Sequence, residues 1–131
     1  MTGCMQTGAR GIPEISIVAP MHNEAGNVGE FLSRVHSTLF GRSLEIVAVD
    51  DGSTDQTAAV LDRWQIVNMP VRLLSHKKNR GLEAAILLGL KNSRGRIVAV
   101  LDTDLQDPPE LLETLYASIV EGSTIARGVR V

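Results

Sequence analysis

The sequence predicts an α/β fold, a doubly wound and mostly parallel sheet with helices on both faces. Short apolar stretches alternate with segments whose apolar residues recur at helical spacing. Aromatic residues make up only 3% of the chain, so we expect an aliphatic core, as in parallel sheets buried between helices. Polar clusters follow each apolar stretch, and right-handed crossovers would bring these clusters to one edge of the sheet.

The length of 131 residues suits one domain. We expect residues 1–13 to be a disordered leader and residues 14–131 to form one folded domain. The leader lacks the apolar core of a secretory signal, and no apolar run reaches the roughly 20 residues of a membrane span. Cys4 is the only cysteine, which favours a reducing, cytoplasmic setting. A net charge of −2 gives no electrostatic reason to expect a nucleic-acid partner.

Four short apolar stretches predict strands, because each is bounded by turn-forming residues. In chain order they are residues 15–19, 44–49, 71–74 and 97–101. Pro20 is expected to end the first strand, since proline has no N–H group for a sheet ladder. Residues 124–126 predict a fifth strand.

The first two helices are predicted from periodicity and from a capping pattern. Apolar residues recur at helical spacing from Val28 to Leu39. Ser53 is followed three residues later by Gln56, which has the form of a capping box at the start of the second helix.

The third and fourth helices are predicted on similar grounds. The third begins at Leu82, and small residues such as Gly89 should allow it to pack closely on the sheet. The fourth begins at Pro108, where Asp107 and Glu110 can form a capping box.

Asp102 and Asp104 follow the fourth strand directly. Both carboxylates would project at its carboxyl end, where open α/β sheets bind ligands. Carboxylates so close together repel each other unless a cation lies between them, and oxygen ligands suit Mg²⁺ or Mn²⁺. We therefore predict a metal–diphosphate site in which the cation neutralises charge on a leaving group. A solvated turn is the alternative.

Polar residues also follow the first two strands. An acidic residue after the second strand of such a sheet commonly reaches a ribose or a base, and we favour Asp51 over Asp50 for this contact. Asn23 and Glu24, after the first strand, are candidate substrate-binding residues or helix caps. Asp55 has the character of a turn or cap residue.

The loop after the third strand is basic and precedes a helix. Arg80 and Gly81 lie where free main-chain N–H groups could meet an anion. A solvated loop is the ordinary alternative for such a charge cluster.

Together these clusters resemble family 2 inverting glycosyltransferases. The matching patterns are Pro20-x-x-Asn23-Glu24, Asp50-Asp51-Gly52-Ser53-x-Asp55, Asn79-x-Gly81 and Asp102-x-Asp104-Leu-Gln106. The run 104–110 resembles the branch that glycosylates polyprenyl phosphates, including dolichyl-phosphate mannosyltransferases and undecaprenyl-phosphate sugar transferases. The resemblance implies a GT-A fold, a UDP- or GDP-sugar donor, and Mg²⁺ or Mn²⁺.

The resemblance also implies residue roles. Nucleotide contacts are implied at Pro20, His22, Glu24, Val49 and Asp51. Asp102 and Asp104 become the catalytic pair, and metal and diphosphate contacts are implied at Asp102, Asp104 and Gln106. Thr103 stands where alanine is common, and His22 where tyrosine is frequent. Arg130 matches a position that approaches the sugar phosphate.

The expected reaction transfers the sugar with inversion to a lipid-phosphate acceptor. A phosphate with a second pKa near ~6 is ionised at neutral pH and needs no general base. Longer relatives continue into an acceptor-binding part, so we expect this chain to hold the donor half. Peripheral contact with the cytoplasmic face of a membrane and a homo-oligomer are further expectations.

Two alternatives stay open on the sequence. The chain could be a truncated domain that binds the donor without transferring the sugar. An apolar strand followed by Asp-x-Asp also begins the haloacid-dehalogenase phosphatases, although Gln106 does not match their pattern and little chain remains for their later motifs.

Overall fold

Four parallel strands and four helices alternate along the chain, as the sequence predicts. The computed structural model describes residues 12–67, 69–104, 108–120 and 122. The elements are β1 (Ile15–Met21), α1 (Val28–Thr38), β2 (Leu44–Asp51), α2 (Thr57–Ile66), β3 (Val71–His76), α3 (Leu82–Asn92), β4 (Ile97–Val100) and α4 (Leu111–Val120). The strands lie in the order β3-β2-β1-β4, which confirms the predicted fold class.

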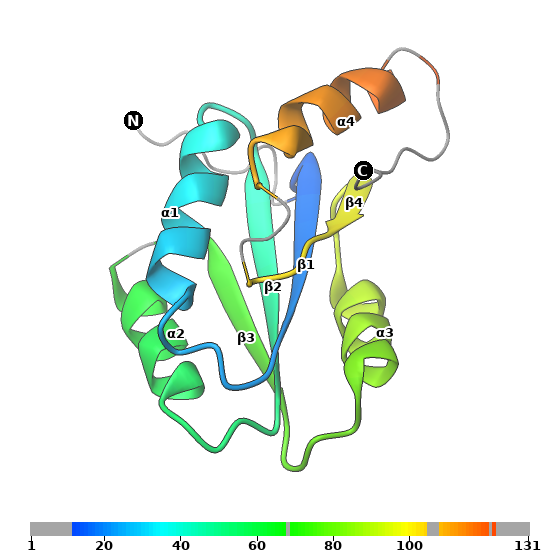
Figure 1. Ribbon diagram of the computed structural model, residues 1–131. Helices are drawn as coiled ribbons and strands as arrows, with labels where there is room; N and C mark the ends of the chain where they lie inside the picture. The colour runs from blue at the N-terminus through cyan, green and yellow to red at the C-terminus, as the bar shows by residue number, and fades with distance from the viewer. Residues whose placement is uncertain (1–11, 68, 105–107, 121, 123–131) are drawn as a thin grey trace.

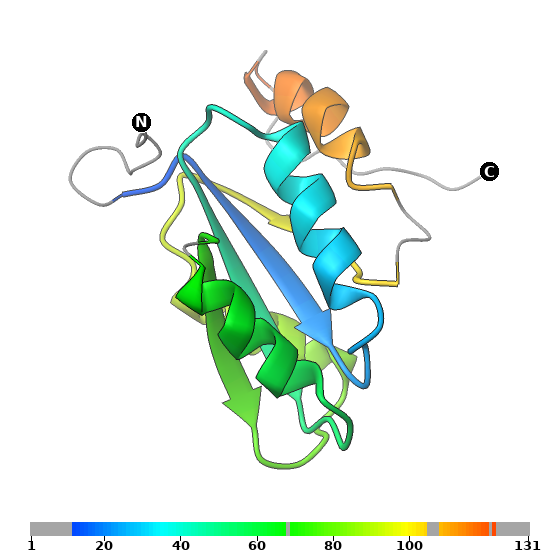
Figure 2. The same cartoon turned by 90° about the vertical axis from the view of Figure 1, so that its left-hand side faces the viewer.

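Helices cover both faces of this sheet (Figures 1 and 2). On one face, α1 and α2 close a core that includes Phe31, Leu32 and Leu61. On the other face, α3 packs on β1 and β2. The remaining helix, α4, lies on the same side as α1, beside its C-terminal end (Figure 2), and its Leu112 belongs to the same core. The chain crosses one face of the sheet after β1 and after β2 and the other face after β3, and β4 then joins β1 on the side away from β2. The strand order therefore reverses between β1 and β4, which makes this pair the topological switch point.

The close approach of α3 depends on its small residues. A Cβ atom at Gly89 would overlap the Val18 side chain, and Ala85 is buried against Val47 and Val49. The predicted tight packing of this helix is confirmed.

The first strand does not stop at Pro20, so that prediction is wrong. β1 continues to Met21, with Pro20 opposite Val49 of β2. On the other side, β4 pairs with β1 only as far as Val18. β1 therefore has one strand neighbour at Pro20, and a residue without an N–H group is tolerated there.

The predicted helix caps differ from the structure. The N-cap of α2 is Gln56, which makes no side-chain capping bond, and Ser53 bonds elsewhere. α4 begins at Leu111 rather than at Pro108, because residues 108–110 form a preceding turn. The capping role of Asp107, the fifth strand at 124–126, and most of the predicted leader lie outside the described residues.

Candidate active site

Loops from the carboxyl end of the sheet enclose a cavity of about 370 Å³. Its lining comes from the last residues of β1 and β2, from the segments that follow β1, β3 and β4, and from the first half of α3. The lining residues are Pro20, Met21, His22, Glu24, Asp51, Asn79, Gly81, Leu82, Ala85, Asp102, Thr103 and Asp104. Four polar clusters that are far apart in the chain therefore meet at one site, as the predicted topology requires.

Asp102 and Asp104 flank a buried residue in the segment after β4. Thr103 is 2% exposed and its hydroxyl donates to the Pro20 carbonyl oxygen over 3.3 Å. Both aspartates are exposed and line the cavity. The threonine thus joins the carboxylate pair to the end of β1 through a bond that an alanine side chain could not make.

The carboxylate pair fits a cation that is shared with a diphosphate. Within the described ranges, no group of three or more His, Cys, Asp or Glu side chains could hold a metal ion. Mg²⁺ is usually bound by one or two carboxylates together with substrate phosphates and water. Asp102 and Asp104 meet that requirement, whereas Gln106, the third predicted metal ligand, lies outside the described residues.

Asp51 is held by the loop that follows β3. It is 4% exposed; its Oδ1 accepts the Arg80 N–H over 2.9 Å and its Oδ2 accepts the Gly81 N–H over 2.9 Å. Burial acts to raise the pKa of Asp51, but hydrogen bonds from Arg80, His76 and Gly81 outweigh it and leave the pKa below its ordinary value. Asp51 is therefore a buried carboxylate that is kept ionised at the cavity wall.

The neighbouring Asp50 has a different task. Its Oδ1 accepts the Ser53 N–H over 3.1 Å, which closes the turn after β2. Asp50 is buried but is not among the cavity-lining residues.

His22 connects three of the loops. Its Nδ1 lies 2.9 Å from the Asp51 carbonyl oxygen, and because a carbonyl only accepts, we assign the proton to Nδ1. Its Nε2 lies 3.3 Å from Asn79 Nδ2 and 3.5 Å from Asn23 Nδ2. With Nδ1 donating, Nε2 can accept from either amide, so His22 links the ends of β1 and β2 to the loop after β3 at the cavity.

Asn23 joins the loop after β1 to the loop after β2 by hydrogen bonds. Its backbone is left-handed, with a φ of 54°. Its Oδ1 accepts the Thr54 N–H over 2.8 Å and the Asp55 N–H over 3.2 Å, while its own N–H donates to Ser53 Oγ over 2.8 Å. The side chain thus caps the loop after β2 rather than α1, and it does not line the cavity.

Glu24 and Asp55 take part in further hydrogen bonds between the same two loops. The Glu24 N–H donates to Thr57 Oγ1 over 2.9 Å, and Glu24 Oε1 accepts from Asn27 Nδ2 over 2.8 Å. Asp55 accepts from the Thr57 hydroxyl and from the Ala25 N–H; the Thr57 hydroxyl contributes most to holding the pKa of Asp55 below its ordinary value. Asp55 is thus a turn residue, as its sequence position suggests.

The other predicted site residues divide into two groups. Val49 is fully buried beside Ala85, and Arg80 is exposed and contributes its N–H to Asp51 rather than its side chain to the cavity lining. Arg130 lies outside the described residues. The sequence did not predict two residues of this site. Leu82 contributes an apolar side chain to the cavity lining, and His76 contacts Asp51 as described below.

A family model for glycosyl transferase family 2 matches residues 16–131. The chain belongs to this family. The match favours the glycosyltransferase interpretation over the phosphatase alternative.

Named relatives of this glycosyltransferase chain include two transferases. A dolichol-phosphate mannosyltransferase from Pyrococcus furiosus is 37% identical over 122 residues, which cover 89% of this chain and 33% of that protein. An undecaprenyl-phosphate 4-deoxy-4-formamido-L-arabinose transferase from Pseudomonas paraeruginosa is 37% identical over 119 residues, with 88% and 35% covered. The chain thus spans about a third of the length of these relatives.

Solved structures agree on the fold. The mannosyltransferase PcManGT from Pyrobaculum calidifontis, in complex with GDP-Man and Mn²⁺, has a TM-score of 0.64 at 27% identity, covering 73% of this chain and 33% of that one. Residues 1–349 of S. aureus TarS give a TM-score of 0.69 at 24% identity, with 90% and 37% covered. These likenesses confirm the predicted GT-A class of architecture.

Proposed function

We propose that the cavity binds a nucleotide-diphospho-sugar together with Mg²⁺ or Mn²⁺. One observation carries this proposal: Asp102 and Asp104 line the same cavity as the carboxyl ends of β1 and β2 and the loop that follows β3. Asp102 and Asp104 would hold the cation, with Gln106 as a third ligand. The cation, when bound, supplies charge neutralisation for the departing diphosphate.

The remaining contacts of the donor follow from the lining residues. The nucleoside would contact Pro20, His22, Glu24 and Asp51. The phosphates would lie near Gly81, at the start of α3. The N–H groups of Arg80 and Gly81 are bound to Asp51, so the prediction that these two groups meet an anion is wrong. The α-helix of 11 residues that begins at Leu82 would instead face the anion with the N–H groups of its first turn. Arg130 is proposed to approach the sugar phosphate.

We further propose that the whole protein transfers the sugar with inversion to a polyprenyl phosphate. A phosphate oxygen of the acceptor forms the new bond to the anomeric carbon, and the nucleoside diphosphate leaves with the electron pair of the broken C–O bond. The acceptor phosphate is ionised near neutral pH, so no base is required.

A lipid-phosphate acceptor would place the protein at a membrane surface. No helix in the described part of the chain is long and apolar enough to cross a membrane. We propose peripheral contact at the cytoplasmic face; a homo-oligomer stays a prediction.

Donor binding is tested by thermal unfolding with a panel of UDP, GDP and their sugar conjugates, with and without MnCl₂. A ligand at about 100 times its dissociation constant should add about 2.7 kcal/mol of stability. Asp104→Asn should remove the Mn²⁺-dependent part of this gain, measured against the unfolding temperature of the same variant without ligand. Asp62→Asn, which removes one exposed charge from α2, is the matched control. A flat panel, or equal gains in both variants, would contradict the proposed site.

Transfer is tested separately, because the chain spans only about a third of its relatives. The donor that gives the largest stabilisation is incubated with undecaprenyl phosphate in detergent, and release of nucleoside diphosphate is measured. Stabilisation without release would favour the alternative of a donor-binding domain that does not complete the transfer by itself.

A further inference from the structure

The last residue of β3 carries a side chain that no part of the proposed chemistry uses. We propose that His76 is a positioning residue: through Asp51 it fixes the main-chain loop that forms one wall of the nucleotide cavity. The inference rests on the proposed function for its consequence, although the contacts themselves do not.

The pairing of strands places the two side chains together. In the parallel register of β2 and β3, Asp51 lies directly opposite His76. His76 Nδ1 is 2.7 Å from Asp51 Oδ1, and the two side chains are 14% and 5% exposed. An ionised carboxylate only accepts hydrogen bonds, so Nδ1 carries the proton in this contact. The direction of the bond is therefore determined by the chemistry of its partner.

Asp51 transmits this contact to the cavity wall. Its two oxygens also accept the N–H groups of Arg80 and Gly81. Gly81 and Asn79 line the cavity, and Gly81 has a φ of 103°. A rotation of the Asp51 carboxylate would release both main-chain N–H groups, and the wall would move with them.

His76 is the side chain that opposes such a rotation. Oδ1 of Asp51 accepts from both His76 and Arg80, whereas Oδ2 accepts from Gly81. Three donors from three positions hold the carboxylate plane in one orientation. Without the imidazole, the Asp51 carboxylate would be oriented only by the N–H groups of Arg80 and Gly81, which belong to the loop that it holds. Preorganisation of this wall would be lost, and binding would have to order the loop at a cost in affinity.

The test compares variants that keep or remove the donor. The amide nitrogen of asparagine can occupy the place of imidazole Nδ1, so His76→Asn should retain the contact, whereas His76→Leu should lose it. His36→Leu is the matched control, because His36 stacks edge-on against Phe40 at the far end of α1. The probes are GDP and UDP with MnCl₂, measured by titration calorimetry, and amide hydrogen exchange followed by NMR.

We expect His76→Leu to weaken nucleotide binding by tenfold or more and to speed exchange at the Arg80 and Gly81 amides. Exchange at Val18 and Val47 in the sheet should stay slow, which separates loop loosening from global unfolding. His76→Asn and His36→Leu should stay within about threefold of the wild-type affinity. The first variant keeps the hydrogen-bond donor, and the second changes a residue that does not line the cavity. If His76→Leu does not fold, His76→Gln, whose donor is one methylene further out, takes its place.

Unchanged exchange at Arg80 and Gly81 would overturn the positioning role whatever the nucleotide data show. Faster exchange with unchanged affinity would overturn its importance for binding. Failure of the wild-type chain to bind any nucleotide would overturn the proposed function, and it is recognisable before any substitution is made.

Discussion

Glu45 and Asp51 lie at opposite ends of β2 and use the same device for different purposes. Side chains alternate along a strand, so both carboxylates project on the α3 side, with Val47 and Val49 between them. Glu45 accepts the Arg94 N–H, just after α3, and Asp51 accepts the Arg80 and Gly81 N–H groups, just before it. One strand thus holds both ends of the helix that packs on it.

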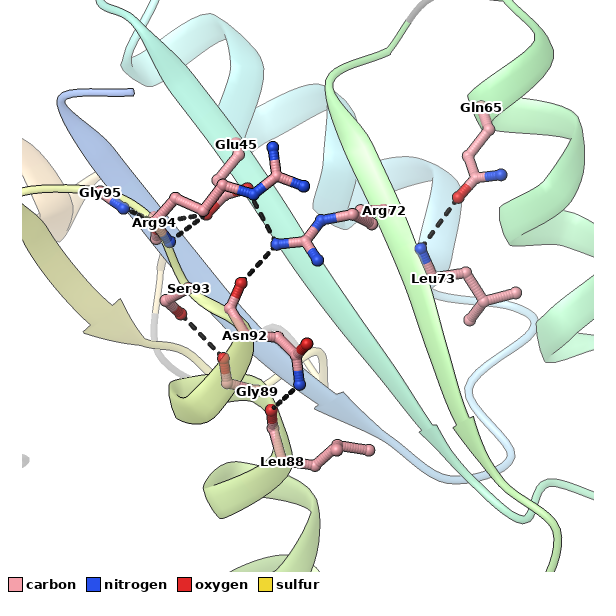
Figure 3. Close-up of polar contacts among 11 residues, drawn as sticks. Glu45, Gln65, Arg72, Leu73, Leu88, Gly89, Asn92, Ser93, Arg94 and Gly95 are labelled. Carbon is pink, nitrogen blue, oxygen red and sulfur yellow. Dashed lines mark hydrogen bonds and ion pairs between the residues drawn. The ribbon is translucent and has the colours of Figure 1, made fainter. Parts of the chain in front are cut away.

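The surroundings of the two carboxylates differ. At the amino end, Glu45 also accepts from Ser16 Oγ over 2.6 Å. It accepts from Arg72 over 3.2 Å as well, and Figure 3 shows this contact together with the one from Arg94. The Ser16 hydroxyl in turn accepts the Gly95 N–H over 2.8 Å, so the network joins β1, β2, β3 and the turn before β4. None of these residues lines the cavity, and the network is a structural joint.

At the carboxyl end the same arrangement borders the cavity. The ion-pair partner of Glu45 is the guanidinium of Arg72, whereas the partner of Asp51 is the imidazole of His76. Equivalent hydrogen bonds therefore stabilise the fold at one end of β2 and shape a binding wall at the other. Substitutions at the two ends should separate stability from ligand binding.

The largest effect is expected from Gly52→Ala. Gly52 has a φ of 69°, and a Cβ atom there would overlap the main-chain N of Asn79. A left-handed alanine and a displaced loop should together cost about 3–5 kcal/mol of unfolding free energy. Urea denaturation measures this loss, and nucleotide titration should show weaker binding. An alanine variant of Gly26, where a Cβ atom meets nothing within 4 Å, is the control; equal stability of both variants would contradict the tight contact between the loops.

Asp51→Asn should have the next largest effect. An amide group offers one acceptor oxygen where three donors now share two carboxylate oxygens, so at least one buried donor is left unpaired at a cost of about 2–4 kcal/mol. Both the unfolding free energy and the affinity for GDP or UDP with MnCl₂ should fall. Asp50→Asn, which affects only the Ser53 turn, should leave nucleotide affinity unchanged.

Glu45→Gln should lower stability by about 1–3 kcal/mol and leave nucleotide affinity unchanged, because its network is polar, partly exposed and remote from the cavity. Paired measurements with Asp51→Asn test the comparison directly. A loss of affinity in Glu45→Gln that matches the loss in Asp51→Asn would show that the two ends are not functionally separate.

Acid should weaken both ends. The pKa of Asp51 is lowered as described, and the pKa of Glu45 is lowered because hydrogen bonds from Ser16, Arg94 and Arg72 outweigh the opposing effect of burial. With folded-state pKa values below the unfolded ones, the unfolded state binds more protons in acid. The stabilisation is therefore complete above the unfolded values of about 4 and is lost as the pH falls through the folded values. The unfolding free energy, measured by urea denaturation from pH 3 to pH 7, should fall with decreasing pH in the wild type and fall less steeply in Glu45→Gln.

The smallest effect is expected at an exposed carboxylate. Glu110 accepts from Arg34 Nε over 3.1 Å and from Nη2 over 2.6 Å, but no bond from a main-chain N–H of another element accompanies this pair among the contacts of the described residues. The side chains are 54% and 32% exposed, so Arg34→Lys should cost less than about 1 kcal/mol. Denaturation in low and high salt measures it. A larger loss would mean that this pair contributes more than an ordinary surface ion pair.

Much of the fold could be predicted from the sequence, because periodicity is local. The strands and helices lie within a few residues of their predicted positions. The Asp102–Asp104 pair was predicted for the cavity edge from one strand and its direction alone. The errors are at element ends: Pro20 lies within β1, and Ser53 does not cap α2. Strand neighbours and long-range bonds decide such ends, and local patterns do not contain them.

The sequence by itself determined the order of strands and helices and the clustering of polar residues at one edge of the sheet. Only the tertiary structure decided how the individual polar groups are used. Asn23 accepts hydrogen bonds from the loop after β2, and Asp51 is oriented by His76 and by the loop before α3. The physical reason is that a carboxylate or amide has only a few lone pairs and donors. Which partners use them depends on strand register and on loops that meet only after folding.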